Sequence, residues 1–162
     1  MPANVAFDTN IFIYSIGGRH EETRGSPEAR AMAAEENRKA AIAKSIVARP
    51  CTISIQLFNE FANVARRKLG LRADDIGAIL ENMARVHHVV AMTWETTRLA
   101  MEVSKIGEST DADGTARPGN FSTYDSLIVA AALLAGCDTL YTEDNHSGLV
   151  VGGRLKIISP FA

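Results

Sequence analysis

The first apolar segment of the chain is Val5-Ala6-Phe7-Asp8-Thr9-Asn10, in which an apolar run leads to an aspartate and two small polar residues. A continuous apolar run is typical of a buried parallel strand, so we expect Asp8 to lie where this strand leaves the sheet. Ligands of open α/β folds bind at that carboxyl edge. The alternative is a plain turn, with Asn10 capping the next helix. The choice depends on whether other carboxylates reach the same edge.

The composition is that of a single soluble domain spanning residues 1–162. Hydrophobic residues make up 46% of the chain and charged residues 22%, which is ordinary for a globular protein of this length. The net charge of −2 gives no global attraction to nucleic acid, so any such binding must come from a local patch. The two cysteines lack a CxxC spacing and fit buried thiols in a reducing compartment. With neither a signal-like start nor an apolar run long enough to cross a bilayer, we expect a cytoplasmic protein that is not bound to a membrane.

Segments with the periodicity of strands alternate with segments typical of helices along the chain. The expected strands are 5–7, 51–55, 88–92, 139–142 and 155–158, and the expected helices are 11–16, 27–48, 56–69, 73–85, 94–106 and 122–135. Residues 107–121 are predicted to form a long irregular connection, which is often functional or mobile. The alternation predicts an α/β fold with a central, mostly parallel sheet of about four to five strands, flanked by helices on both faces.

Four carboxylates fall near one edge of this predicted sheet. Asp8 and Asp144 follow strands, whereas Glu60 and Asp125 lie in the first turns of helices. In a parallel sheet the strands end, and the helices that follow them begin, at the same edge. Asp8, Glu60 and Asp144 are therefore expected to meet there, and Asp125 joins them if its preceding loop returns to that edge.

Each acid also has a purely structural explanation. Asp125 completes a Ser122-x-x-Asp125 capping box, Glu60 fits a solvated helix edge, and Asp144 fits a turn. Together, however, like charges about 4 Å apart repel by several kcal/mol at an intermediate dielectric. A divalent cation offsets this repulsion, and Mg²⁺ and Mn²⁺ prefer carboxylate and water oxygens. The set therefore predicts a Mg²⁺ or Mn²⁺ site.

Carboxylate-held Mg²⁺ recurs in phosphoryl transfer, where it activates water and neutralises charge on phosphate oxygens. A nucleic-acid substrate also requires basic side chains near the site. The candidates for RNA contact are Arg19 and Arg24, in the loop after the first helix, and Arg66 and Arg67, after Glu60. The alternative for the latter pair is a solvated helix end, where cations complement the helix dipole. The loop arginines are the better candidates, because they lie one short helix from Asp8.

Four motifs in order along the chain carry a resemblance to a known family. They are Phe7–Asn10, Leu57–Phe61 around Glu60, Tyr124–Ala131 with Asp125, and Leu140–Asp144. The ordered set resembles PIN-domain proteins and, among them, the VapC-like toxins of bacterial toxin–antitoxin pairs.

The resemblance implies a PIN fold and a Mg²⁺- or Mn²⁺-dependent ribonuclease. Asp8, Glu60, Asp125 and Asp144 would be its acidic, metal-binding site. It further implies supporting roles for Thr9, Asn10 and Thr142, of which Asn10 and Thr142 would orient carboxylates or water. Family members commonly form homodimers and are silenced by an antitoxin whose tail enters the site.

Two departures from the family pattern affect these expectations. Residues 107–121 form a longer connection than the family norm, and the polar insert 17–26 is also long; either would alter substrate access or partner choice. Glu143 beside Asp144 leaves open which of the two reaches the metal, and the family pattern favours Asp144.

The leading hypothesis is an endoribonuclease that cuts single-stranded or loop RNA with a metal-activated water. The alternative is a PIN-fold module that binds RNA or a partner without cutting, and the repulsion within a complete acidic set argues against it. A third hypothesis is a phosphatase of the haloacid dehalogenase type. That chemistry requires an Asp-x-Asp pair after the first strand, and the chain has Asn10 at the second position.

Overall fold

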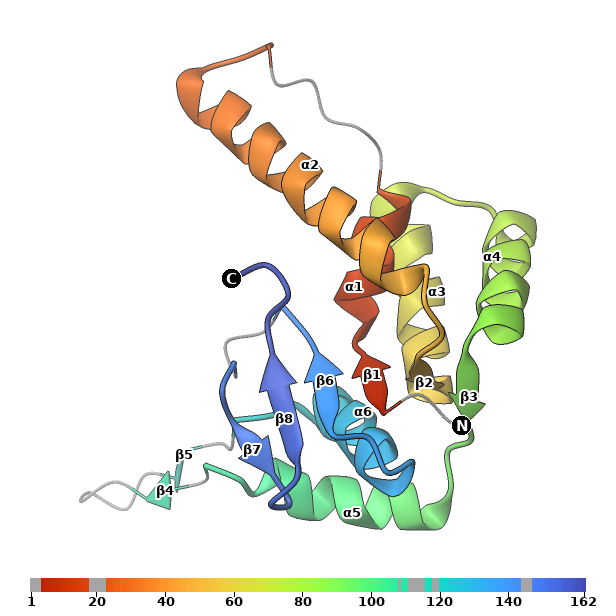
Figure 1. Cartoon of the computed structure of the whole chain (residues 1–162), viewed down its shortest axis with the longest axis vertical. Coiled ribbons are helices and arrows are strands. Elements are labelled where there is room, and N and C mark those ends of the chain that lie inside the picture. The colour runs from red at the N-terminus through yellow and green to blue at the C-terminus, as the bar shows by residue number, and fades with distance from the viewer. Residues whose placement is uncertain (1–3, 18–22, 108, 111–115, 118–119, 144–146) are drawn as a thin grey trace.

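The computed structural model describes residues 4–17, 23–107, 109–110, 116–117, 120–143 and 147–162. Within these ranges the central sheet has the strand order β3-β2-β1-β6-β8-β7 (Figure 1). The strands are β1 (Val5–Phe7), β2 (Thr52–Ser54), β3 (His88–Val90), β6 (Thr139–Tyr141), β7 (Val150–Val151) and β8 (Leu155–Ile158). All neighbouring pairs are parallel except β7 with β8.

The central strand β1 lies between β2 and β6, and its register with β6 positions the candidate site. Phe7 pairs with Tyr141, and the backbone N–H of Asp8 donates to the carbonyl of Tyr141 at 2.9 Å. The two strands therefore end level with each other. The residues that follow them, Asp8 and Thr142, leave the sheet side by side.

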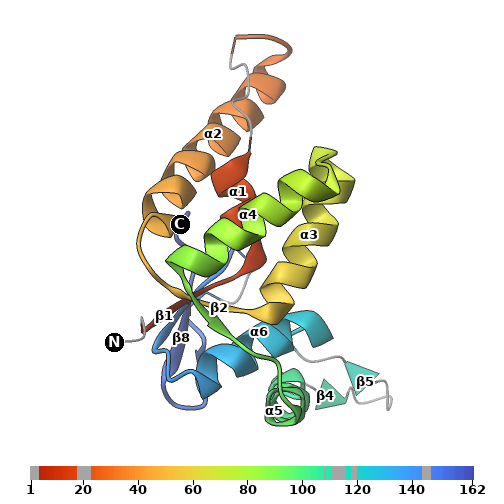
Figure 2. The same cartoon turned by 90° about the vertical axis from the view of Figure 1, so that its right-hand side faces the viewer.

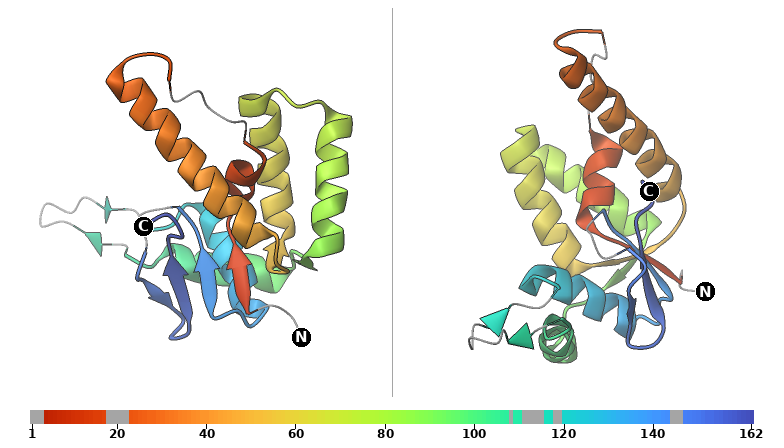
Figure 3. Two further views of the ribbon diagram at one scale, coloured as in Figure 1. Left: turned by 45° about the horizontal axis from the view of Figure 1, so that its top comes forward. Right: turned by 90° about the vertical axis from the view of Figure 1, so that its left-hand side faces the viewer.

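Helices cover both faces of the sheet (Figures 2 and 3). They are α1 (Thr9–Ile16), α2 (Pro27–Val47), α3 (Ile55–Leu69), α4 (Ala73–Val86), α5 (Trp94–Ser104) and α6 (Thr123–Leu134). Successive strand residues enter different cores: Ala6 packs with residues of α5 and α6, whereas Phe7 packs with residues of α1 to α4. Burial of both faces explains why β1 is apolar without a break.

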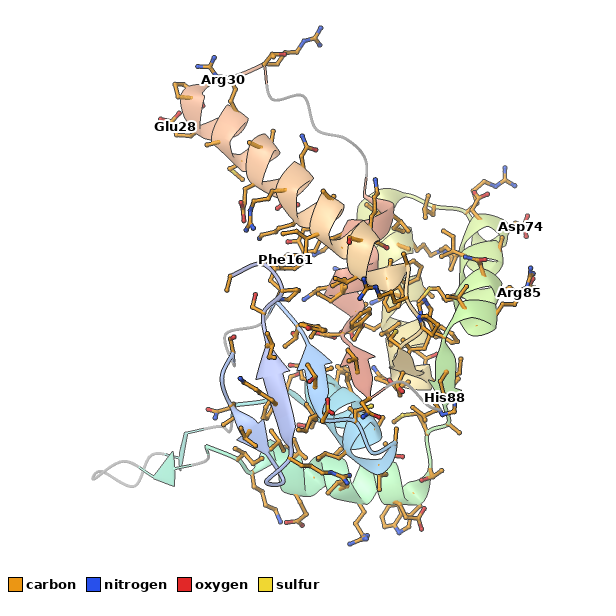
Figure 4. All side chains as sticks on the ribbon, in the orientation of Figure 1. Glu28, Arg30, Asp74, Arg85, His88 and Phe161 are labelled. Atoms are coloured by element: carbon orange, nitrogen blue, oxygen red, sulfur yellow. The ribbon has the colours of Figure 1, made fainter. Side chains whose placement is uncertain are left out.

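Local signals explain where several helices begin and end. Ser26 caps α2, with proline at the first helical position, as expected for a helix start. Gly70 ends α3 with φ of 64°, a left-handed conformation that favours glycine. The amino-terminal half of α2 extends away from the rest of the molecule, and Figure 4 labels Glu28 and Arg30 near its free end.

The predicted fold class is confirmed, with two corrections. The sheet has six strands among the described residues, not four to five, because β7 has only two residues and gives no detectable alternation. The connection 107–121, expected to be irregular, contains the antiparallel strands β4 (Ser109–Thr110) and β5 (Ala116–Arg117). In the described part of the chain, no helix has the length and apolar character needed to cross a membrane.

Candidate active site

Asp8 is the most enclosed of the acids of the candidate site that the structure describes. Its side chain is 6% exposed and follows β1 directly, as the sequence predicts. One carboxylate oxygen, Oδ1, accepts from the backbone N–H of Thr9 at 2.6 Å, so Asp8 also caps α1. The other oxygen, Oδ2, accepts from the hydroxyl of Thr142 at 2.8 Å. Two donors thus fix the carboxylate, as a buried polar group requires.

Thr9 connects Asp8 to Glu60. Its hydroxyl donates to Oε2 of Glu60 at 2.7 Å, across 51 positions of sequence, while its backbone N–H binds Asp8. The side chain is buried, so it bridges the start of α1 to the exposed face of α3. Asn10, expected to orient a carboxylate or water, makes no side-chain hydrogen bond with any residue that the structure describes.

Asp125 lies at the start of α6 and forms the capping box that its spacing predicts. Ser122 Oγ donates to Oδ2 of Asp125 at 2.6 Å, and the backbone N–H of Asp125 donates back to Ser122 Oγ at 3.2 Å. The structural explanation for Asp125 is therefore correct. It does not compete with a site, because these bonds use one carboxylate oxygen only.

A small pocket of about 10 Å³ brings Asp8 and Asp125 together. Its lining also includes Thr142 and the apolar residues Phe121, Ile128, Val129, Leu140 and Ile157. The space corresponds to about one water-sized sphere, and its polar walls are oxygen-bearing side chains. Apolar walls strengthen electrostatic interactions with these oxygens.

The donor chemistry of this pocket fits a hard divalent ion. Mg²⁺ commonly binds one or two carboxylates and completes its shell with water and substrate phosphate, so Asp8 and Asp125 supply an adequate protein part. Among the described residues, no three His, Cys, Asp or Glu side chains gather closely enough to form a metal site by themselves. Asp144, the fourth predicted acid, lies outside the described residues.

Glu143 has partners that the sequence did not predict. Its Oε1 accepts from Nζ of Lys39 at 2.5 Å and from the hydroxyl of Tyr14 at 2.9 Å. Lys39 also lies over the rings of Tyr14 and Phe161. Burial, together with the bond to Glu143, raises the pKa of Tyr14 to about 12, and the bond to Glu143 raises the pKa of Lys39. These contacts tie Glu143 to α1 and α2.

The described RNA-contact candidates lie on two separate elements. Arg19 lies outside the described residues, and Arg24 lies in the turn before α2, at the end of that helix farthest from the sheet (Figure 1). Arg66 and Arg67 are exposed in the last turn of α3. By helical periodicity Arg67 shares a face with Glu60, seven residues earlier.

A buried Cys51–His87 contact has the residue types of a nucleophilic pair but not the environment. Cys51 Sγ lies 3.2 Å from His87 Nδ1, and Phe12 packs edge-on against the imidazole. Burial raises the pKa of the Cys51 thiol to about 12 and lowers the pKa of His87. Reactive cysteines need the opposite shift, so the pair belongs to the core.

The comparison with known proteins identifies the class to which the chain belongs. The model of the PIN domain family matches residues 5–148, and no curated protein gives a significant match. The chain is therefore a member of the PIN domain family. PIN domains are generally nucleases, which suggests hydrolase activity and binding to RNA.

Proposed function

We propose that this chain is a metal-dependent endoribonuclease that hydrolyses RNA phosphodiester bonds with a water activated by Mg²⁺ or Mn²⁺. The proposed metal-binding and catalytic residues are Asp8, Glu60, Asp125 and Asp144. The observation that carries the proposal is the shared pocket of Asp8 and Asp125, which are distant in sequence. Thr9 links Glu60 to the same carboxylate.

The protein's own part in the reaction is to hold oxygens in place before substrate arrives. Thr142 and the backbone of Thr9 fix both oxygens of Asp8, and Ser122 fixes one oxygen of Asp125. A bound divalent ion lowers the pKa of its water and neutralises charge on phosphate oxygens. The carboxylates would hold such an ion and would help to orient the water that it activates.

Asp144 is preferred over Glu143 as the acid after β6. Glu143 is half-buried and held by Lys39 and Tyr14, so moving it to the pocket would break an ion pair and leave a lysine without its partner. For substrate, we propose that Arg66 and Arg67 contact RNA phosphates beyond the site, since both are exposed on α3.

The biological role that we propose is that of a VapC-like toxin, active as a homodimer in the cytoplasm and silenced by a cognate antitoxin. The order and spacing of the motifs around Asp8, Glu60, Asp125 and Asp144 support this role. A toxin of this kind arrests growth when it is expressed alone. The Asp8→Asn variant is expected not to do so, and arrest by both proteins would contradict the role.

RNA cleavage in Mg²⁺ or Mn²⁺, against a chelator control, tests the proposed activity. Asp8→Asn keeps an oxygen to cap α1 but removes the charge of the proposed metal ligand. Loss of a residue that is only hydrogen-bonded to a metal ligand already costs about 10–100-fold in activity. The rate of cleavage by Asp8→Asn should therefore fall by more than about 100-fold. Asp138→Asn is the matched control, since Asp138 is exposed and lies before β6, at the opposite edge of the sheet. This variant should cleave normally.

Two results would contradict the proposed activity. Equal cleavage by Asp8→Asn and the parent would remove Asp8 from the site. RNA binding without cleavage in either metal would instead favour the non-catalytic PIN-fold binding module.

A further inference from the structure

A second, larger hollow lies beside Glu60, between α3 and the start of α6. It has a volume of about 400 Å³, within the range of pockets that bind small ligands. Its lining residues are Gln56, Asn59, Glu60, Asn63 and Tyr124. We refer to this hollow as the amide–tyrosine groove.

Helical spacing builds one wall of the amide–tyrosine groove. Gln56, Asn59, Glu60 and Asn63 follow one another at i, i+3, i+4 and i+7 on α3, so they share a face. The opposite face of α3 is buried through Leu57, Phe61 and Ala65. The polar face is therefore held in a fixed orientation by a packed core.

Glu60 accepts from the hydroxyl of Thr9, but the other hydrogen-bonding side chains of the groove have no partner among the described residues and can bind a ligand. Within the described part of the chain, no hydrogen bond occupies the side-chain amides of Gln56, Asn59 and Asn63 or the hydroxyl of Tyr124. Each amide offers both donors and an acceptor. Tyr124 is 60% exposed, so its ring is accessible for stacking.

The charge of the groove selects among possible ligands. Its described lining contains no lysine, arginine or histidine, and its only charged member is Glu60. An anionic phosphate is therefore disfavoured there. A neutral, flat group with several hydrogen-bonding positions on its edge is complementary to three amides and one aromatic ring, and an unpaired nucleobase is such a group.

We propose that the amide–tyrosine groove binds one unpaired base of single-stranded RNA, stacked on Tyr124 and hydrogen-bonded at its edge by Gln56, Asn59 and Asn63. The proposal rests on the proposed function in one respect, namely that this base flanks the phosphate to be cut. Tyr124 directly precedes Asp125, and Glu60 lies in the groove itself. A base bound here therefore places an adjoining phosphate next to the acids, so the groove would set sequence preference at the cut.

Affinity for a single-stranded RNA hexamer of mixed sequence tests the groove without requiring cleavage. The parent protein for this experiment is Asp8→Asn in Mg²⁺, which keeps the RNA intact. Adding Tyr124→Ala should weaken binding by about 5-fold or more, because stacking of one base contributes about 1–3 kcal/mol and about 1.4 kcal/mol is tenfold in affinity. Tyr124→Phe should restore affinity, since the ring is retained. Asn82→Ala, an exposed asparagine on α4, should bind like the parent.

A hexamer of the same backbone without bases distinguishes a base site from a change in folding. The loss caused by Tyr124→Ala should vanish with this abasic hexamer, because there is no base to stack. Equal affinity of Tyr124→Ala and the parent for the normal hexamer would overturn the proposal, and so would an equal loss with both hexamers. If the wild-type chain cuts no RNA, the proposed function fails, but the binding comparison still decides whether the groove holds a base.

Discussion

Replacing Thr142 by valine removes one hydroxyl group while keeping the shape of the side chain. In the structure that hydroxyl donates to Oδ2 of Asp8 at 2.8 Å, and both side chains are almost fully buried. A hydrogen bond to a charged group contributes about 1.5–3 kcal/mol to stability. Thr142→Val should therefore lower the free energy of unfolding by about 1.5–3 kcal/mol. For a protein of this size, the melting temperature would fall by about 3–12 °C.

Urea denaturation without metal measures this loss, and Thr139→Val is its matched control. Thr139 lies at the other end of β6 and also donates to an aspartate, Oδ1 of Asp138 at 2.9 Å, but that aspartate is exposed. Water replaces the lost bond there, so the change should stay within about 0.5 kcal/mol. Losses of equal size in the two variants would refute the reasoning that burial of Asp8 makes the Thr142 hydroxyl important.

Three further predictions concern buried groups outside the pocket. Burial lowers the pKa of His87, so just below the ordinary histidine pKa of about 6.5 the unfolded state binds more protons than the folded state. The free energy of unfolding should therefore fall as the pH drops from 7.5 to 5.5. Urea titrations should show a larger fall in the parent than in His87→Gln. Equal slopes in the parent and in His87→Gln would contradict the assignment. Cys51 and Cys137, whose thiol pKa values are raised by burial, should resist alkylation at pH 8 until the protein unfolds; rapid labelling of the folded protein would be inconsistent with this burial. Finally, Ser126 Oγ is buried without a hydrogen-bond partner among the described residues, so Ser126→Ala should leave stability unchanged or raise it by about 1 kcal/mol, and a clear loss would show that the hydroxyl has a partner.

The sequence predicts those parts of the site that depend on strand direction. Parallel strands end at one edge of a sheet, so the sequence predicts that Asp8 and the residues after β6 leave the sheet there. The role of Thr142 is implied only by the family resemblance, and its hydrogen bond to Asp8 depends on the pairing of β1 with β6, which the sequence does not specify. The capping box of Asp125 follows from local spacing. The shared edge and the capping box need only the period of the elements and the direction of the strands.

Contacts that depend on side-chain conformation could not be predicted in this way. The bond from Thr9 to Glu60 and the ion pair between Lys39 and Glu143 join positions 51 and 104 residues apart. Neither follows from the order of the elements, because several rotamers and helix positions are compatible with the same sequence pattern. The sequence therefore left Glu143 and Asp144 as equal alternatives by spacing, while the structure shows Glu143 engaged with α1 and α2.

Short or tertiary features also escaped the sequence pattern. Two residues of β7 are too few to show alternation, and they form a strand only because β8 offers an edge for pairing. The amides of Gln56, Asn59 and Asn63 are recognisable as the polar face of a helix, but that face alone is most simply explained by exposure to solvent. Only the position of Tyr124 across from them turns the face into the wall of a groove.

A crystal structure of the protein soaked in Mn²⁺ tests the central claim most directly, because anomalous scattering locates the ion. The expected result is an ion bound by carboxylate oxygens of Asp8 and Asp125, with Asp144 and Glu60 coordinating it directly or through its water shell. A Mn²⁺ ion bound elsewhere, or a pocket that stays free of metal while RNA is still cleaved, would contradict the claim that these acids form the catalytic metal site.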